Sequence, residues 1–443
     1  MDIFDLLLSP FYLIVAFFLA YKYKAKHEYK SGAYKYFLPG LTAKIIGAIS
    51  LGLVYTYYYP SGDTINYFNT AKAFIDVFMN KPGDFFYLYF GSPSFSEYYL
   101  FRTGEDFVYW VNDPYAYFVA KCFFPFVLLG CKSYMASSII LASLCYLSVW
   151  KLYEVFINEF PGLVKEFAYS ILFIPSVVFW GGGLMKDSIT FSSVCLYVYG
   201  FYWFLIQKRY KYSFVISILV ASFLLLSIKP YVFFALLPGS VVWFVATKVE
   251  KIKNGFVKIM IAPTIIAFGG LLTFYLINTL GDKLGKYSID KIFATAHGAQ
   301  NDLKQSYYQG NTFDIGDYEP NFLGILSVSH KAIFASLFRP TIFDIRNIIM
   351  FFSALENTFL LLFCIYLFVK LKVYKFFVII RSNSLALFSM IFALFFALSV
   401  GVSISNFGTL VRLKIPCIPF FVSSLVIVNY LITNPTKLKN DGS

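Results

Sequence analysis

Apolar stretches of membrane-spanning length alternate with short polar connections along most of this chain. A membrane-spanning helix needs about 20 mostly apolar residues, and roughly twelve segments approach that length. These stretches do not alternate apolar with polar residues, so they predict helices rather than the strands of a membrane barrel. The predicted segments are roughly 3–21, 37–59, 114–130, 133–153, 167–181, 187–206, 213–228, 231–247, 259–280, 347–369, 384–405 and 412–432.

Two long polar segments, roughly 60–113 and 281–345, interrupt this pattern. Connections between helices usually have about 2–8 residues, and longer ordered ones are often functional. Apolar residues at helical spacing in each segment predict an interfacial helix whose apolar face lies toward lipid. The apolar sets are Ile65, Phe68, Ala71, Ile75 and Phe78 in the first segment, and Phe322, Ile325, Leu326, Ile333 and Leu337 in the second.

The composition agrees with a membrane protein. The chain is 59% hydrophobic with a mean hydropathy of +0.67, and only 14% of its residues are charged. Soluble domains carry about 25% charged residues. We therefore expect an all-α, polytopic transmembrane helical bundle of about 11–12 hydrophobic segments. It would form a single integral membrane domain over 1–432, followed by a polar tail at 433–443.

The net charge of +13 does not indicate nucleic acid as a partner, because the lysines gather in short loops between the predicted spans. Such loops mark the cytoplasmic side of a membrane. The basic loops lie at 21–36, 208–211, 248–258 and 370–375. They share one side only if an early segment fails to span, and we assign this to 114–130, which carries Lys121 and Pro125 in its middle. Both long segments then face outward.

Asp63 is the first candidate for chemistry, since it follows Gly62 a few residues beyond the predicted span 37–59. A carboxylate at the membrane surface, partly shielded from water, can serve as a general base. Asp63 also precedes the predicted interfacial helix, where it suits the N-cap position. Both roles stay open, and one residue can fill both.

The run Phe179–Asp187 joins two predicted spans and contains three consecutive glycines. Glycines let the backbone approach another group closely. Lys186 could neutralise a phosphate, and Asp187 could orient that phosphate or cap the next helix. The spacing differs from the GxxxxGK[ST] phosphate loop. A simple tight turn between helices explains the run equally well.

Basic residues also occur at span ends that are predicted to face outward, where positive charge is uncommon. One arginine side chain can bind two phosphate oxygens at once. Several cations on one face therefore suggest an anionic headgroup such as a lipid-linked pyrophosphate. Taken singly, each is also explained by snorkelling toward lipid headgroups. Glu356, inside the predicted span 347–369, is either functional or the partner of a basic side chain. The cationic set is Lys229, His330, Arg339, Arg346 and Arg412.

We expect neither a metal nor a cofactor. The sequence has no DxD or HExxH motif, and its six cysteines form no CxxC pair. Asp314-Ile315-Gly316-Asp317 places two carboxylates in one loop, but it is a weak candidate for a cation site.

Four short motifs carry a resemblance to a known class of enzymes. They are Ser61-Gly62-Asp63, Phe179–Asp187, Arg339-Pro340 and Asn406–Arg412. Their layout resembles the bacterial GT-C-like membrane glycosyltransferases, including the O-antigen-polymerase-like proteins of cell-envelope polysaccharide synthesis. In GT-C enzymes an acidic residue of the first outer loop is the base for the acceptor, and the donor is a polyprenyl-phosphate sugar. The resemblance implies that Asp63 is this base.

The chain departs from that pattern in two respects. It lacks the DxD metal motif of some members, and it lacks the Arg-x10-Gly pattern of some polymerases, because Met350 stands eleven residues after Arg339. The subfamily therefore stays open.

We predict a glycosyltransferase or polysaccharide polymerase in the bacterial inner membrane. It would move sugar from a polyprenyl-(pyro)phosphate-linked donor to a glycan acceptor at the outer face, with membrane lipids as its surroundings. The leaving phosphate would be held by Lys186, Arg339, Arg346 and Arg412, with support from Asp187, Lys229, His330 and Glu356.

The alternative function is a transporter or flippase of a lipid-linked saccharide. Transporters carry ionisable residues in mid-span and have broken or repeated helices. This sequence places most charges at span ends and shows no repeat, which favours the enzyme. An assembly partner without activity is a third interpretation.

Overall fold

The computed structural model describes residues 3–59, 62–91, 112–249, 288–305 and 311–434, with the isolated positions 108, 110, 275, 279 and 285. These residues are largely helical and contain no strand, although one antiparallel bridge joins Thr312 and Asn406. Seven of the described helices are long and apolar enough to cross a membrane, and a bent helix pair can add an eighth. The protein is an all-α integral membrane protein, which confirms the predicted fold class.

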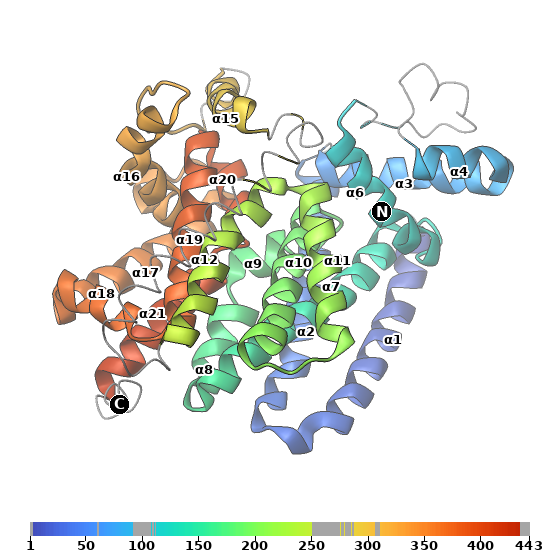
Figure 1. The fold of residues 1–443 in the computed structure, drawn as a ribbon. Helices are drawn as coiled ribbons and strands as arrows, with labels where there is room; N and C mark the ends of the chain where they lie inside the picture. The colour runs from blue at the N-terminus through green and yellow to red at the C-terminus, as the bar shows by residue number, and fades with distance from the viewer. Residues whose placement is uncertain are drawn as a thin grey trace. The chain divides into compact units, whose positions relative to one another are not determined.

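The chain groups into two compact units, which are described separately (Figure 1). Unit 1 comprises Met1–Gly200 and Ser213–Lys229, and unit 2 comprises Phe201–Tyr212 and Pro230–Ser443. The single integral membrane domain over 1–432 stays a prediction beside this grouping.

Unit 1 is a group of long helices capped at one end by shorter ones. Its helices are α1 (Ile3–His27), α2 (Phe37–Tyr57), α3 (Asp63–Asn80), α4 (Pro82–Phe90), α6 (Pro114–Leu129), α7 (Tyr134–Glu159), α8 (Val164–Phe167), α9 (Pro175–Trp180), α10 (Lys186–Phe201) and α11 (Tyr212–Ile228). Short 3-10 turns occur at Glu28–Lys30, Gly32–Tyr36 and Pro161–Leu163, and a π-helical turn at Ala168–Leu172.

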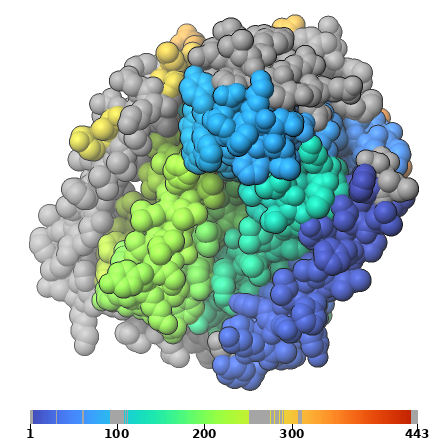
Figure 2. All heavy atoms as spheres, turned by 90° about the vertical axis from the view of Figure 1, so that its right-hand side faces the viewer, coloured from blue at the N-terminus to red at the C-terminus, as the bar shows by residue number. Residues whose placement is uncertain are grey.

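The centre of unit 1 is the contact between α2 and α7. α2 also packs against α9, and α1 lies against α7. Figure 1 shows α3 and α4 lying across one end of this helix group, and Figure 2 shows α1 along its outer side. Only 11% of the residues in the most apolar 18-residue stretch of α1 are buried by the rest of the protein. This helix therefore offers most of its surface to surrounding lipid.

The predicted interfacial helix of the first loop exists as α3, but its apolar face does not lie toward lipid. Phe68, Ala71 and Ile75 are buried, and α3 packs against α6. The apolar residues of α6, including Phe123 and Val127, belong to the same hydrophobic cluster. The apolar stripe was predicted correctly, but a protein helix covers it.

Two predicted spans are broken. Segment 167–181 divides into the π-helical turn and α9, because Ile174 precedes Pro175 and takes an extended conformation (ψ 119°). Segment 412–432 begins at the end of α20 (Phe407–Leu413) and continues, after a break, as α21 (Ile418–Thr433); the two helices are bent by 66°.

Three other predicted spans do not appear as helices of full membrane-spanning length among the described residues. Segment 114–130 forms the 16-residue α6, and segment 213–228 forms the 17-residue α11; both are apolar but shorter than a full span. The proposal that 114–130 does not cross the membrane stays a prediction. Segment 259–280 lies outside the described residues, apart from positions 275 and 279.

Unit 2 is centred on α19 (Ser384–Ser403). This helix packs against α12 (Pro230–Val249), α16 (Phe322–Phe338) and α21. Of the residues in its most apolar 18-residue stretch, 67% are buried. The remaining elements are the π-helical turn Tyr202–Ile206, α15 (Ile289–Leu303), the 3-10 turn Ile342–Asp344, α17 (Ile348–Leu371), α18 (Val373–Arg381) and α20. In Figure 1, α15 and α16 lie at the same end of unit 2.

The second predicted interfacial helix corresponds to α16. Its last predicted apolar residue, Leu337, is buried, and α16 packs on α19. Phe322 and Leu326 at its start are exposed. α16 is therefore partly a packing element of unit 2, because one side of the helix meets α19.

Candidate functional site

The glycine run of unit 1 packs directly on one face of α2. Cβ atoms placed on Gly181–Gly183 in turn would lie 3.2 Å from Lys44 Nζ, 2.6 Å from Ala48 N and 2.6 Å from Leu51 Cδ2. These three residues of α2 follow one another at helical spacing along a single face. The predicted close approach is therefore an approach to α2, and at Gly182, where the neighbour is backbone, only glycine leaves enough room for it.

Asp63 and Lys186 each follow a glycine that contacts α2 near its C-terminal end, and the two contacts are one helical turn apart. Asp63 follows Gly62, whose Cβ position would lie 2.6 Å from the ring of Tyr55. Tyr55 is one helical turn beyond Leu51, the residue that the last glycine of the run touches, and side chains at this spacing lie about 5–6 Å apart. Lys186 begins α10 shortly after that glycine.

One hydrophobic cluster joins the elements that carry these residues. It contains Tyr67 and Phe68 of α3, Leu184 and Ile189 at the start of α10, and Ile228 at the end of α11. The cluster thus gathers three element ends that bear predicted site residues. Those residues are Asp63, Lys186, Asp187 and Lys229, four of the nine predicted from the sequence.

Asp63 is not the N-cap of α3. Gly62 takes that position with φ +152°, a backbone conformation that side chains disfavour, and Asp63 is the first helical residue. A carboxylate in the first turn is stabilised by the helix dipole. Its neighbour Thr64 is fully buried and hydrogen-bonds to the hydroxyl of Tyr134 at 2.7 Å, which ties α3 to the start of α7.

Asp187 and Lys229 form a buried ion pair. Lys229 Nζ donates to Asp187 Oδ1, and their side chains are 4% and 0% exposed. A buried charge must be paired to be tolerated, so each residue supports the other. This contact joins α10 to the end of α11 and gives both residues a structural task. Their supporting role toward a phosphate stays a prediction.

We expect Gly182→Ala to destabilise unit 1. The added methyl group would meet the backbone of α2 at 2.6 Å from Ala48 N, and backbone cannot move aside as a flexible side chain does. Overpacking of this kind costs about 1–3 kcal/mol or more. Thermal unfolding of the detergent-solubilised protein measures it, with Gly32→Ala as control, since nothing lies within 4 Å of that position. Equal unfolding midpoints for the two variants would contradict the packing.

Lys44 is a buried cation that the sequence analysis did not single out. It is 4% exposed within α2, and its ammonium lies 5.7 Å from the centre of the Phe191 ring, beside Gly181. Ionisable residues inside a span are functional candidates by default. The available signal was its position as the charged residue within the apolar run 37–59.

Arg339 of unit 2 is engaged by a carboxylate and two rings. Its Nη2 lies 2.5 Å from Asp344 Oδ1 and its Nε 3.2 Å from Oδ2, a bidentate pair. The guanidinium also lies 5.4 and 5.0 Å from the ring centres of Phe313 and Phe407. Burial alone would raise the pKa of Asp344, but hydrogen bonds from Arg339 and Thr341 outweigh it and lower that pKa. Arg339 therefore has a structural role, and its binding of phosphate stays a prediction.

A further buried lysine, Lys414, holds three elements of unit 2 together. It is fully buried, and its Nζ donates to Asn357 Oδ1 at 2.7 Å, to the carbonyl of Arg339 at 3.3 Å and to that of Leu337 at 3.5 Å. Glu356 interacts with it electrostatically. Of the two roles that were open for Glu356, the contact favours the partner of a basic residue.

The remaining predicted cations occupy separate positions in unit 2. His330 is exposed on α16, Arg346 is exposed two residues before α17, and Arg412 is half-buried in α20. Their binding to phosphate stays a prediction. In the described part of the chain, no three or more His, Cys, Asp or Glu side chains gather as metal ligands.

An apolar cavity of about 440 Å³ lies in unit 1 between α1, α2 and α7. Its wall includes Tyr12, Leu19, Leu41, Ile139 and Leu147. α7 reaches this wall at Ile139, five residues beyond Tyr134, which is about 7.5 Å along the helix axis. The cavity therefore begins near the point where α7 contacts the start of α3.

Comparison with known proteins adds no assignment. No protein-family model, curated protein or solved structure matches this chain.

Proposed function

We propose that this membrane protein is a glycosyltransferase or polysaccharide polymerase that uses a polyprenyl-(pyro)phosphate-linked sugar donor and a glycan acceptor at the outer face of a bacterial inner membrane. The observation that carries the proposal is that the segments leading into Asp63 and Lys186 contact neighbouring positions near the end of α2. One is a carboxylate and the other an ammonium, and both stand at helix starts beside the same face of a membrane helix.

In the proposed reaction, the Asp63 carboxylate takes the proton from an acceptor hydroxyl. The resulting oxygen attacks the anomeric carbon of the donor sugar, and the bond from that carbon to the phosphate oxygen breaks. The phosphate leaves with the bonding electrons as negative charge grows on it. A cation already positioned at that oxygen lowers the barrier, and this is the role proposed for Lys186.

The apolar cavity supports a lipid-linked donor. A polyprenyl chain is hydrocarbon and stays in an apolar environment when it moves from the bilayer into a groove between helices. The cavity begins about 7.5 Å along α7 from the contact between α7 and α3. The sugar phosphate would then lie at the membrane surface, near Asp63.

A flippase for the same lipid-linked saccharide is the second candidate, and specific observations favour it. Lys44 is a cation buried inside α2, and the helices are broken between α8 and α9 and between α20 and α21. Buried charges and interrupted helices are features of transport sites.

Reconstitution into liposomes that contain lipid-linked saccharides extracted from the host separates the two candidates. A transferase lengthens the glycan on one lipid and releases polyprenyl phosphate or pyrophosphate, which mass spectrometry detects. A flippase moves the intact lipid across the bilayer, which makes it accessible to a lectin added outside. We expect longer glycan and released polyprenyl phosphate. Translocation without any longer product would overturn the transferase.

A further inference from the structure

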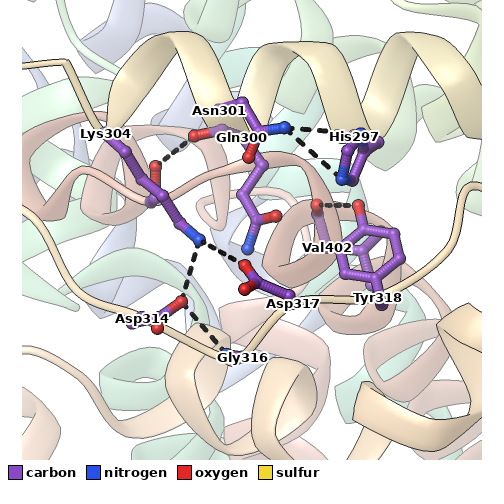
Figure 3. Close-up of polar contacts among 10 residues, drawn as sticks. His297, Gln300, Asn301, Lys304, Asp314, Gly316, Asp317, Tyr318 and Val402 are labelled. Carbon is purple, nitrogen blue, oxygen red and sulfur yellow. Dashed lines mark hydrogen bonds and ion pairs between the residues drawn. The ribbon is translucent and has the colours of Figure 1, made fainter.

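A cluster of polar side chains lies in unit 2 where α15 faces residues 314–318 (Figure 3). Lys304 Nζ, just beyond the end of α15, lies 3.0 Å from Asp314 Oδ1 and 3.6 Å from Asp317 Oδ1. The amide of Gly316 donates to Asp314 Oδ1 at 3.0 Å, in a turn whose φ of +93° suits glycine. The hydrogen bond from Lys304 is the main cause that lowers the pKa of Asp314, so this carboxylate is charged at neutral pH.

The backbone around this cluster is held by hydrogen bonds. Ser405 Oγ donates to the carbonyl of Gln300 at 2.7 Å, and Phe313 N donates to the carbonyl of Ser405 at 2.8 Å. The hydroxyl of Tyr318 donates to the carbonyl of Val402 at 2.7 Å. α15 and the segment 311–318 are therefore both attached to the end of α19, which fixes the backbone from which Gln300, Asp314 and Asp317 project.

Gln300 is the unusual member of the cluster. Its side chain is 1% exposed, and among the described residues its Nε2 has no hydrogen-bond partner. Figure 3 shows this side chain extending from α15 toward Lys304 and Asp317. Buried amide groups are nearly always hydrogen-bonded, because losing the bond to water without a replacement is costly. The missing acceptor is therefore one that another molecule can supply.

The chemistry of the cluster selects among ligands. It offers donors at Gln300 and Lys304 and acceptors at Asp314 and Asp317, all within a small region. A sugar hydroxyl donates and accepts at once, so adjacent hydroxyls match such a mixed set. A phosphate would face two carboxylates. A divalent cation would compete with Lys304 for both carboxylates, and it would find no third acidic, His or Cys ligand in the described cluster.

We propose that Gln300, Lys304, Asp314 and Asp317 form a binding subsite for one sugar residue of a glycan chain. Gln300 Nε2 donates to one hydroxyl, and the Asp317 carboxylate accepts from its neighbour. The identification of the ligand as glycan rests on the proposed function. The subsite itself lies outside unit 1 and takes no part in the proposed bond-breaking step.

The test uses Gln300→Met in the full-length protein, held in nanodiscs. Methionine has a similar length and no donor. The probe is a set of oligosaccharides released by mild acid from the surface glycan of the host, and calorimetry gives Kd. We expect about tenfold weaker binding. The unfolding midpoint should stay unchanged or rise, because a buried unpaired amide is removed. Lys291→Gln, an exposed change near the start of α15, should bind as the wild type does.

Other results of the Gln300→Met test would overturn the subsite. Wild-type protein that does not bind the oligosaccharides overturns it, as does a Gln300→Met variant with wild-type Kd. Weaker binding together with a lower unfolding midpoint would make Gln300 a structural residue instead. Asp63→Asn separates this proposal from the proposed function. Binding that persists in that variant while transfer is lost supports both, whereas persistence of both binding and transfer removes Asp63 as the base and leaves the subsite standing.

Discussion

Replacing Asp63 by asparagine is expected to lower the rate of glycosyl transfer by about 100- to 10,000-fold, the usual contribution of a general base. Asparagine has the same shape but cannot take the proton of the acceptor hydroxyl. The fold should tolerate the change, because Asp63 is half-exposed at the first position of α3 and the lost helix-dipole interaction is worth only about 0.3–1 kcal/mol. Polyprenyl phosphate released in liposomes measures the rate.

The same variant can be examined in cells, where lipid-linked precursor should accumulate at unchanged protein abundance. Asp84→Asn is the matched control, since Asp84 is also a half-exposed carboxylate in the first turn of a helix in the same loop. We expect it to behave as the wild type does. An Asp63→Asn variant that transfers sugar at the wild-type rate would remove Asp63 from the mechanism.

Replacing Lys229 by methionine is expected to destabilise the protein by about 3–5 kcal/mol, because it leaves the Asp187 carboxylate charged and buried without this partner. Thermal unfolding in detergent and the abundance of the protein in membranes both report the effect. A wild-type unfolding midpoint for this variant would show that the pair does not hold α10 and α11 together.

The double variant Asp187→Leu, Lys229→Met separates structure from chemistry. Replacing both members of a buried ion pair by apolar residues of similar volume is often neutral or even stabilising. We therefore expect most of the lost stability to return, and transfer activity to return with it. A double variant that folds well but fails to transfer sugar would instead assign the pair a direct role toward the phosphate.

The membrane-spanning helices were the easiest part of the fold to predict, because long apolar runs have few alternatives. Their interruptions were harder. Pro175 opens α9 and its predecessor Ile174 is extended, a restriction that the sequence shows locally. Hydropathy alone passes over such a proline, since the flanking residues are as apolar as those of a continuous span.

The orientation of α3 could not be read from its pattern. Phe68, Ala71 and Ile75 mark an apolar face, but lipid and the apolar residues of α6 both suit such a face. Only the tertiary packing distinguishes them. Helical period predicts that a face is buried and leaves open what buries it.

The candidate site was predictable in its residues and not in its contacts. Asp187 and Lys229 are 42 residues apart in the sequence, so no local sequence pattern predicts that they form a pair. The glycine run was recognised as a place of close approach, but its partner α2 lies far earlier in the chain. Lys44 and Lys414 became notable only because packing buries them, which depends on neighbours from other elements.

The contact of the glycine run with α2 limits how unit 1 can move. Gly182 lies against the backbone of α2, and a Cβ atom on Gly47 of α2 would lie 2.1 Å from the carbonyl oxygen of Val178 in α9, so sliding or turning of α2 past the α9–α10 connection brings backbone against backbone. These parts must travel as one rigid body. Any opening that admits a long lipid tail therefore falls to α1, which borders the cavity and has few buried residues along its apolar stretch. Asp5 accepts hydrogen bonds from Ser133 and Met135 at the start of α7, so this contact is the pivot about which the rest of α1 would move.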